Sequence, residues 1–238
     1  MTDWYKDPQY VETIVTPLSE QLAAVCLQKA FSKIIGTAPK AISVAILWAQ
    51  CALETGRFHK INNYNYGNIK KCHKPDDGKN FYMTATGENI WDVQNKVTKW
   101  QWFVPDHIQT HFVSNNSAEE GAEHYVNFLA KRIRYAKAWA QVIAGDPNKY
   151  NHELKVANYY TADEIIYGKG VFSLTNYFMK NVDKLLAPLS DEITINQPTE
   201  LFSDEEKAHI LSLVNLTNDM SIEDYFKNSN NDNAEEVA

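Results

Sequence analysis

One glutamate, Glu54, ends a nearly all-apolar stretch of sequence that begins at Pro39. From position 41 onward, its only polar side chains are those of Ser43, Gln50 and Glu54. At about 100° per residue of a helix, Gln50 and Glu54 lie roughly 20° to either side of Ser43. A helix that is apolar on nearly all sides is buried. The pattern therefore predicts a buried helix whose single polar stripe lines a cleft and ends in a carboxyl group.

The environment predicted for Glu54 favours acid catalysis. Apolar surroundings disfavour the carboxylate anion and raise the pKa of the carboxyl group. The partial negative charge at the C-terminal end of a helix acts in the same direction. A glutamic acid that is still protonated near neutral pH can donate its proton to a glycosidic oxygen. On the stripe alone, a solvated helix end is the better account, so the following motifs decide.

Four motifs follow one another in an informative order. Residues 53–56 read Leu-Glu-Thr-Gly, and residues 62–70 read Asn-Asn-Tyr-Asn-Tyr-Gly-Asn-Ile-Lys. Residues 117–121 read Ser-Ala-Glu-Glu-Gly and lead to Arg-Tyr-Ala-Lys-Ala at 134–138, and residues 157–163 read Ala-Asn-Tyr-Tyr-Thr-Ala-Asp. Together these segments resemble the lysozyme-like peptidoglycan hydrolases, and most of all the β-N-acetylglucosaminidases of glycoside hydrolase family 73 and their phage-encoded relatives.

Three residues depart from the family pattern. Asn68 is an extra residue between Gly67 and Ile69, which leaves the geometry of that loop open. Asn158 and Tyr160 stand where the family has small residues.

The resemblance implies a lysozyme-like α+β fold, mostly helical, with a small β-hairpin. It also implies that Glu54 is the general acid at the base of a saccharide groove and that Tyr159 lies beside the acid and the bound N-acetyl sugar. Side chains that anchor or turn a loop carry the same sequence signature as sugar-binding ones. With that alternative open, the predicted substrate-binding residues are Ser43, Gln50, Asn63, Tyr64, Tyr66, Asn68 and Tyr160.

A second carboxylate is expected on the hairpin, where this family tends to carry it. Glu88, in a Thr-Gly-Glu segment, is the first choice and Asp92 the second, although Glu88 also suits an ordinary turn. If no second carboxylate approaches Glu54, the acetamido oxygen of the substrate or its muramic 6-hydroxyl group can attack instead. The second route makes a lytic transglycosylase, and a muramidase on the same substrate also stays open.

The remaining pattern predicts the elements that position these residues. Thr16 caps a helix that starts at Pro17 and stops at Gly36, and a capping box at Ser117 opens one long helix that ends before Gly145 and buries Ile133. The other predicted elements are a helix at 39–56, an ordered loop at 57–80, strands at 81–84 and 97–104 joined as a hairpin, and helices at 147–157, 161–167, 172–187 and 203–216. We expect a catalytic domain over residues 1–190 and a helical appendage over 191–238 with an acidic, disordered tail.

Composition narrows the partners. The formal net charge of −7 argues against nucleic acid and anionic membranes. The basic cluster 131–134 is expected on the solvated face of a helix. The sequence shows no secretory signal and no apolar run that could span a bilayer. A protein acting on the cell wall would then be delivered by a phage or a secretion system, with a delivery or immunity protein as a partner.

Other classes of protein have weaker support in the sequence. His107 and His111 have the spacing of a helical metal pair, to which Cys72 and His73 would add ligands. Ile108 stands where the catalytic zinc motif has glutamate, so we predict no metal and no cofactor. The remaining alternative is a non-catalytic glycan-binding or structural module of a phage tail or secretion apparatus, which would have no need for a sheltered acid at Glu54.

Overall fold

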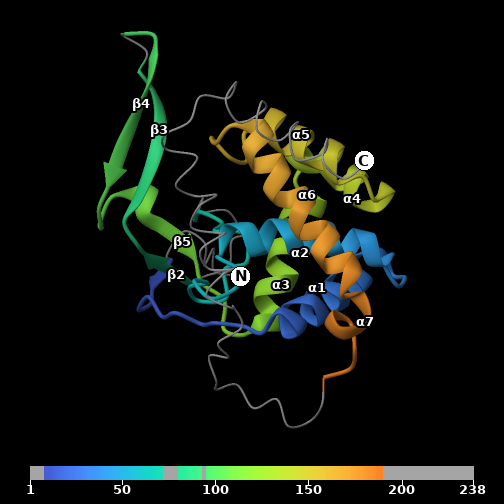
Figure 1. Cartoon of the computed structure of the whole chain (residues 1–238). Coiled ribbons are helices and arrows are strands. Elements are labelled where there is room, and N and C mark those ends of the chain that lie inside the picture. Colours follow the sequence, from blue (N-terminus) through green and yellow to red (C-terminus); the bar gives the residue numbers. More distant parts are fainter. Residues whose placement is uncertain (1–7, 72–79, 93–94, 190–238) are drawn as a thin grey trace, which may run out of the picture. The chain divides into compact units, whose positions relative to one another are not determined.

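The computed structural model describes residues 8–71, 80–92 and 95–189. The chain divides into a first unit, Met1–Ile195, and a second, Asn196–Ala238, and only the first contains described residues. This unit is mostly helical and carries two small sheets, which confirms the predicted α+β class (Figure 1). The predicted helix at 203–216 and the acidic tail lie outside the described residues.

Helix α2 (Ala41–Glu54) lies in the middle of the helical part of the unit (Figure 1). All ten residues from Ser43 to Ala52 are buried, as expected for a helix that is apolar on nearly every side. The helix ends where Thr55 turns away from the α conformation. The Thr55 hydroxyl group donates a 2.6 Å hydrogen bond to the carbonyl oxygen of Cys51. Glu54 is therefore the last residue of α2, as predicted within two residues.

Helix α1 (Glu20–Ile35) begins three residues later than predicted, with Ser19 as its cap. The segment before it is extended instead. The backbone N–H groups of Thr16 and Leu18 donate to the carbonyl oxygens of Ile61 and Phe58. These bonds to the loop after α2 replace the first helical turn. Gly36 ends the helix in the left-handed conformation, as predicted.

The single long helix predicted from Ser117 to Gly145 is wrong. Helix α3 (Ala118–Lys131) ends at Arg132, and a short 3₁₀ turn, η4 (Ile133–Tyr135), leads into α4 (Ala136–Ala144). Ile133, expected in the buried stripe, is 94% exposed. The break is held by Arg134, whose guanidinium group donates to the backbone carbonyl oxygens of Ala157 and Asn158.

The two helices predicted at 161–167 and 172–187 are instead one long helix, α6 (Glu164–Lys180), followed by the short α7 (Val182–Leu185). Helix α6 starts at Asp163, whose side chain caps the N–H groups of Ile165 and Ile166. It packs on α2 and on α5 (Pro147–Val156). A Cβ atom at Gly170 would lie 3.1 Å from the Cδ1 atom of Leu53, so glycine allows this close approach of α6 to α2.

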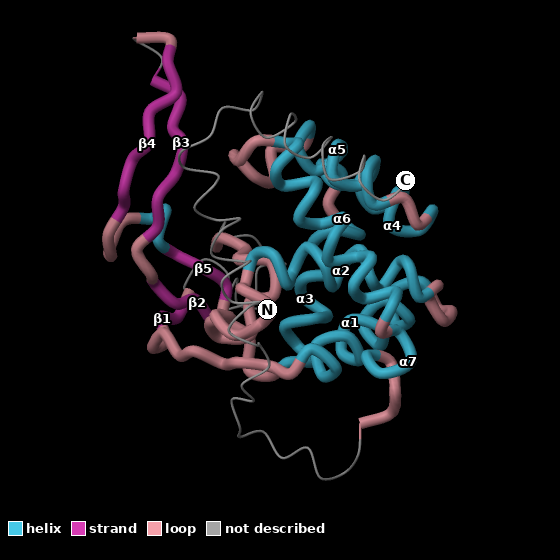
Figure 2. The backbone as a smooth tube through the Cα atoms, in the orientation of Figure 1, coloured by secondary structure: helices cyan, strands magenta, loops and turns pink. Residues whose placement is uncertain are grey.

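The strands form two sheets, and the predicted hairpin is present as one of them, but with a different first strand (Figure 2). In the first, β2 (Asn80–Met83) pairs in parallel with β1 (Gln9–Tyr10) and antiparallel with β5 (His111–Val113). In the second, β3 (Thr86–Asp92) and β4 (Val97–Phe103) form a two-stranded ribbon in which Glu88 is opposite Gln101. The stretch expected to be a turn is therefore itself a strand, and it takes the place of 81–84 as the partner of β4.

Candidate functional site

The end of α2 opens into a cavity of about 690 Å³. Glu54 lies in its lining, together with parts of the loop 60–70, the start of β3, the break between α3 and α4, and the segment 158–162. Tyr167 of α6 completes the wall beside Glu54. The motifs at 53–56, 62–70 and 157–163, which are far apart in sequence, thus all contribute to one cavity.

The carboxyl group of Glu54 is held by Tyr167. The Tyr167 hydroxyl group donates a hydrogen bond of 2.5 Å to Oε1 of Glu54. Burial raises the pKa of Glu54 above its ordinary value, and the hydrogen bonds from Tyr167, Asn68 and Gln50 lower it in part. Burial and the charge of Glu54 also raise the pKa of Tyr167, which therefore keeps its proton and remains a donor.

Gln50 connects this pair to the interior. Its side-chain nitrogen Nε2 donates to the Tyr167 hydroxyl group at 3.4 Å. Its oxygen Oε1 accepts hydrogen bonds from the hydroxyl groups of Tyr125 and, at 3.0 Å, Tyr150. Buried polar groups need such partners, and a fully bonded network fixes their orientation. The amide of Gln50 is thereby fixed on the buried side of Tyr167.

Ser43 and Gln50 do not line the cavity, contrary to the expectation from the polar stripe. Both are buried, with exposed fractions of 1% and 0%. The helical phase was right, but Ser43 lies roughly 16 Å from Glu54 along the helix axis, at 1.5 Å per residue. Only the last turn of α2 reaches the cavity. Gln50 acts through Tyr167 rather than by touching a ligand.

Part of the asparagine- and tyrosine-rich loop anchors the backbone instead of lining the cavity. Asn63 donates to the carbonyl oxygen of Glu12 at 2.9 Å and to Oγ of Ser114 at 3.2 Å. Tyr66 is fully buried, and the partly exposed Tyr64 is not among the cavity residues. The structure thus places Asn63, Tyr64 and Tyr66 away from the cavity, in keeping with the alternative that they anchor the loop.

Asn68, the extra residue of this loop, does line the cavity. Its side-chain amide donates a 2.8 Å hydrogen bond to the backbone carbonyl oxygen of Glu54, one of the unpaired carbonyl groups at the end of α2. The preceding residue, Gly67, accepts a 2.9 Å hydrogen bond from the hydroxyl group of Tyr159. A Cβ atom at Gly67 would lie 2.6 Å from that hydroxyl oxygen, so only glycine fits there.

Tyr159 and Tyr160 both lie in the cavity wall, as expected. Burial and the charge of Glu54 raise the pKa of Tyr159. The ring of Tyr160 stacks on that of Tyr167, with centroids 3.7 Å apart and planes within 9°. Its hydroxyl group donates to Oδ1 of Asn151 at 2.8 Å. Tyr160 therefore buttresses the tyrosine that holds Glu54.

Of the two acids considered as partners, Glu88 lines the cavity and Asp92 does not. Glu88 is near the start of β3 and forms a 2.7 Å ion pair with Lys70, another cavity residue. Asp92, at the far end of the same strand, pairs with Lys99 on the exposed part of the ribbon. Glu54 and Glu88 thus share one cavity.

The cavity residues that sequence reasoning missed include Tyr167, Lys70, Arg132 and Arg134. The two arginines belong to the cluster expected on a solvated helix face. They reach the cavity because the helix breaks at Arg132. Tyr167 carries no local signal, because the contact with Glu54 joins residues 113 positions apart.

The two histidines considered as a metal pair, His107 and His111, do not have helical geometry. His107 caps a 3₁₀ turn, η3 (Ile108–Thr110), while His111 starts β5 and stacks on the ring of Phe81. Within residues 8–71, 80–92 and 95–189, no three potential metal ligands gather. Cys72 and His73 lie outside these ranges. Cys26 and Cys51 are buried free thiols.

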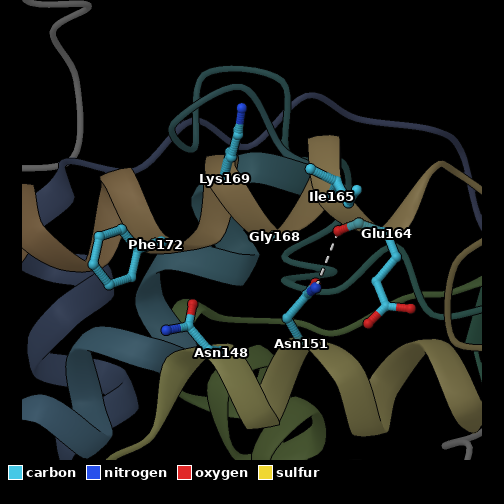
Figure 3. Close-up of a pocket in the computed structure, with 7 residues that line it drawn as sticks. All are labelled: Asn148, Asn151, Glu164, Ile165, Gly168, Lys169 and Phe172. Carbon is cyan, nitrogen blue, oxygen red and sulfur yellow. Dashed lines mark hydrogen bonds between the residues drawn. The ribbon is translucent and has the colours of Figure 1, made fainter. Parts of the chain in front are cut away.

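A smaller hollow of about 260 Å³ lies between α5 and α6 (Figure 3). Its polar lining includes Asn148, Asn151 and Glu164, and Asn151 donates to the backbone carbonyl oxygen of Glu164. The Glu164 carboxylate is itself paired with His152 at 2.9 Å. This hollow offers one carboxylate that already has a partner, so the larger cavity is the stronger candidate for chemistry.

Comparison with known proteins gives one distant likeness. The fold is similar to a crystal structure of a peptidoglycan hydrolase mutant from Sphingomonas sp. A1, at 19% sequence identity and a TM-score of 0.43, over 69% of this chain and 99% of that one. No protein-family model and no curated protein matches the sequence. In the described part of the chain, no helix is long and apolar enough to cross a membrane. A likeness this distant assigns no activity to the chain. The proposal of a function therefore rests on the residues of the cavity.

Proposed function

We propose that the protein is a glycoside hydrolase that cleaves the β-1,4 glycan strand of peptidoglycan, with Glu54 as its general acid. The observation that carries the proposal is the carboxyl group of Glu54, which faces the 690 Å³ cavity with a raised pKa. The motifs of residues 53–70 and 157–163 support the choice of substrate, because they resemble those of peptidoglycan hydrolases and line the same cavity. The cell wall is then the place of action.

The first step is protonation of the leaving group. Because Oε1 of Glu54 accepts the hydrogen bond from Tyr167, the acidic proton is on Oε2. Glu54 gives this proton to the glycosidic oxygen as the bond to the anomeric carbon breaks. Asn68 fixes the backbone of Glu54, and Tyr167 fixes its carboxyl group, so both orient the acid without taking the proton.

Glu88 is the proposed second carboxylate. Lys70 forms a 2.7 Å ion pair with it, and both residues line the cavity that contains Glu54. In an inverting reaction Glu88 activates water as a base, and in a retaining reaction it attacks the anomeric carbon itself. Tyr159 and Tyr160 present partly exposed aromatic rings to the same space, where an N-acetyl sugar would bind.

The finer proposal is an N-acetylglucosaminidase, with a muramidase and a lytic transglycosylase as the alternatives. Mass spectrometry of digested peptidoglycan separates them. Reducing-end N-acetylglucosamine supports the glucosaminidase, reducing-end muramic acid the muramidase, and 1,6-anhydro ends the transglycosylase.

The variant that tests the role of Glu54 is Glu54→Gln, which keeps the shape of the side chain and removes the acid. We expect this variant to bind glycan and release no product. Full activity of Glu54→Gln would refute the central role of Glu54. Binding without any cleavage by the unaltered protein would instead favour a glycan-binding module.

A further inference from the structure

The cavity carries more positive charge than the chain as a whole. Its charged lining residues are four cations, Lys60, Lys70, Arg132 and Arg134, and two acids, Glu54 and Glu88. The formal charge of the whole chain is −7. Lys70 is paired with Glu88, and an acid that donates a proton from Glu54 carries no charge before it reacts. Lys60 and Arg134 form no ion pair with a described residue, so their positive charge is not compensated within the described part of the chain.

Arg134 is held in a fixed orientation. Its Nε and Nη2 atoms donate to the backbone carbonyl oxygens of Ala157 and Asn158, and its guanidinium carbon lies 5.6 Å from the centre of the Tyr135 ring. A guanidinium group has five N–H donors, so these two bonds leave others available. No carboxylate of the described residues forms an ion pair with Arg134. Its charge is thus positioned but not neutralised by the described part of the chain.

Arg132 lies beside it because of the helix break. Its guanidinium carbon is 4.2 Å from the centre of the Phe128 ring. The extended backbone of Arg132, followed by the turn of η4, brings both arginines into the cavity lining, whereas an unbroken helix would carry residues 132 and 134 about 200° apart. We call Arg132, Arg134 and the two rings beneath them, Phe128 and Tyr135, the arginine wall.

We propose that the arginine wall binds carboxylate groups of the peptide stems of peptidoglycan, so that the enzyme prefers peptide-bearing glycan to bare glycan. This inference rests on the proposed function and adds a specificity to it. N-acetylglucosamine is neutral, whereas a peptide stem carries free carboxylates. Planar guanidinium groups, pre-oriented on aromatic rings, suit bidentate binding of a carboxylate. Glu54 and the arginine wall line the same cavity. A glycan bound with its glycosidic bond at Glu54 would therefore bring a peptide stem to the arginine wall.

Binding is the measurement to use, because it does not depend on cleavage. Calorimetric titration of Glu54→Gln would use purified glycan fragments free of phosphate polymers, in three forms: with tripeptide stems, with stems whose carboxylates have been amidated, and with stems removed by an amidase. We expect peptide-bearing fragments to bind about tenfold more tightly than either other form, as for a hydrogen-bonded charge pair at a partly exposed site. Raised salt should reduce this preference.

Substitutions in the arginine wall then show which residues cause the preference for peptide-bearing fragments. Arg132→Gln and Arg134→Gln, each in the Glu54→Gln background, should reduce the tenfold ratio, and the double substitution should bring it close to one. Lys131→Gln removes a neighbouring positive charge outside the cavity lining and should keep the ratio. Arg134→Lys should retain part of it, because the charge stays while the planar fork is lost.

The outcomes are distinct from those that test the proposed function. Equal binding of the three fragments, an undiminished ratio in the double variant, or no binding of any fragment would overturn the arginine-wall proposal. Cleavage of bare and peptide-bearing strands at equal binding would leave the hydrolase standing without this specificity. A stem preference with no cleavage by the unaltered protein would support the wall and refute the hydrolase.

Discussion

The hydroxyl group of Tyr167 donates a 2.5 Å hydrogen bond to Oε1 of Glu54, across 113 residues of sequence. The bond connects the end of α2 with the first half of α6. It favours the charged form of Glu54, whereas burial favours the neutral form, and burial has the larger effect. The acidity of the proposed catalytic group is therefore set by two opposing influences that can be changed separately.

Replacing Tyr167 by phenylalanine should raise the pKa of Glu54 further, because the variant loses the largest influence that lowers it. Activity that depends on protonated Glu54 should then persist to higher pH, so the alkaline limb of the kcat profile shifts upward. We also expect kcat to fall about tenfold, since the carboxyl group loses one orienting bond. Tyr177→Phe is the matched control, because Tyr177 is also on α6 but its hydroxyl group donates to Glu20 and not to Glu54. An unchanged or downward-shifted limb in Tyr167→Phe would contradict this account.

The raised pKa of Glu54 also predicts a cost in stability. The folded protein holds this proton more tightly than the unfolded chain, so the free energy of unfolding decreases as pH rises from the ordinary glutamate value through the raised one. Glu54→Gln cannot ionise and avoids this loss. Urea unfolding should show equal stabilities of the two proteins at acidic pH and a more stable variant above the raised pKa. A variant that is less stable at alkaline pH would show that the charged carboxylate is well accommodated.

Glu88→Gln should lower kcat by about 10² to 10⁴ if Glu88 acts as the base or nucleophile. Its cavity position and its ion pair with Lys70 motivate this expectation. Asp92→Asn, on the same strand but outside the cavity lining, should retain activity within about twofold of the parent protein, as expected for a surface change. Steady-state kinetics on purified peptidoglycan would decide. Near-normal kcat in Glu88→Gln would point to attack by the acetamido or 6-hydroxyl group of the substrate.

Gln50→Leu should destabilise the protein by about 3 kcal/mol, because it leaves the buried hydroxyl groups of Tyr125 and Tyr150 without their acceptor. The same change at the partly exposed Gln28 of α1 should cost less than about 0.5 kcal/mol. Thermal or urea unfolding of the two variants measures the difference. Comparable losses at both positions would show that the network around Gln50 adds little to stability.

Local sequence signals predicted the parts of the site that depend on neighbours in the chain. The apolar run before Glu54 follows from burial of one continuous segment, and the buried helix appears as expected. The break at Arg132 was missed because it depends on carbonyl oxygens more than twenty residues away, which attract the side chain of Arg134. The pairing of β3 with β4 was missed because the Thr-Gly-Glu segment has the composition of a turn. Tyr167 depends wholly on how α6 packs.

The close approach at Gly170 and Leu53 makes the distance between α2 and α6 part of the chemistry. Leu53 directly precedes Glu54, and Gly170 lies one helical turn after Tyr167, so the glycine that sets the spacing also sets the reach of the tyrosine to the acid. A Cβ atom added at Gly170 would require the end of the Leu53 side chain to move by a few tenths of an ångström. In the proposed hydrolase, a change in the spacing of α2 and α6 would therefore alter the acidity of Glu54 without any change to the residues that line the cavity.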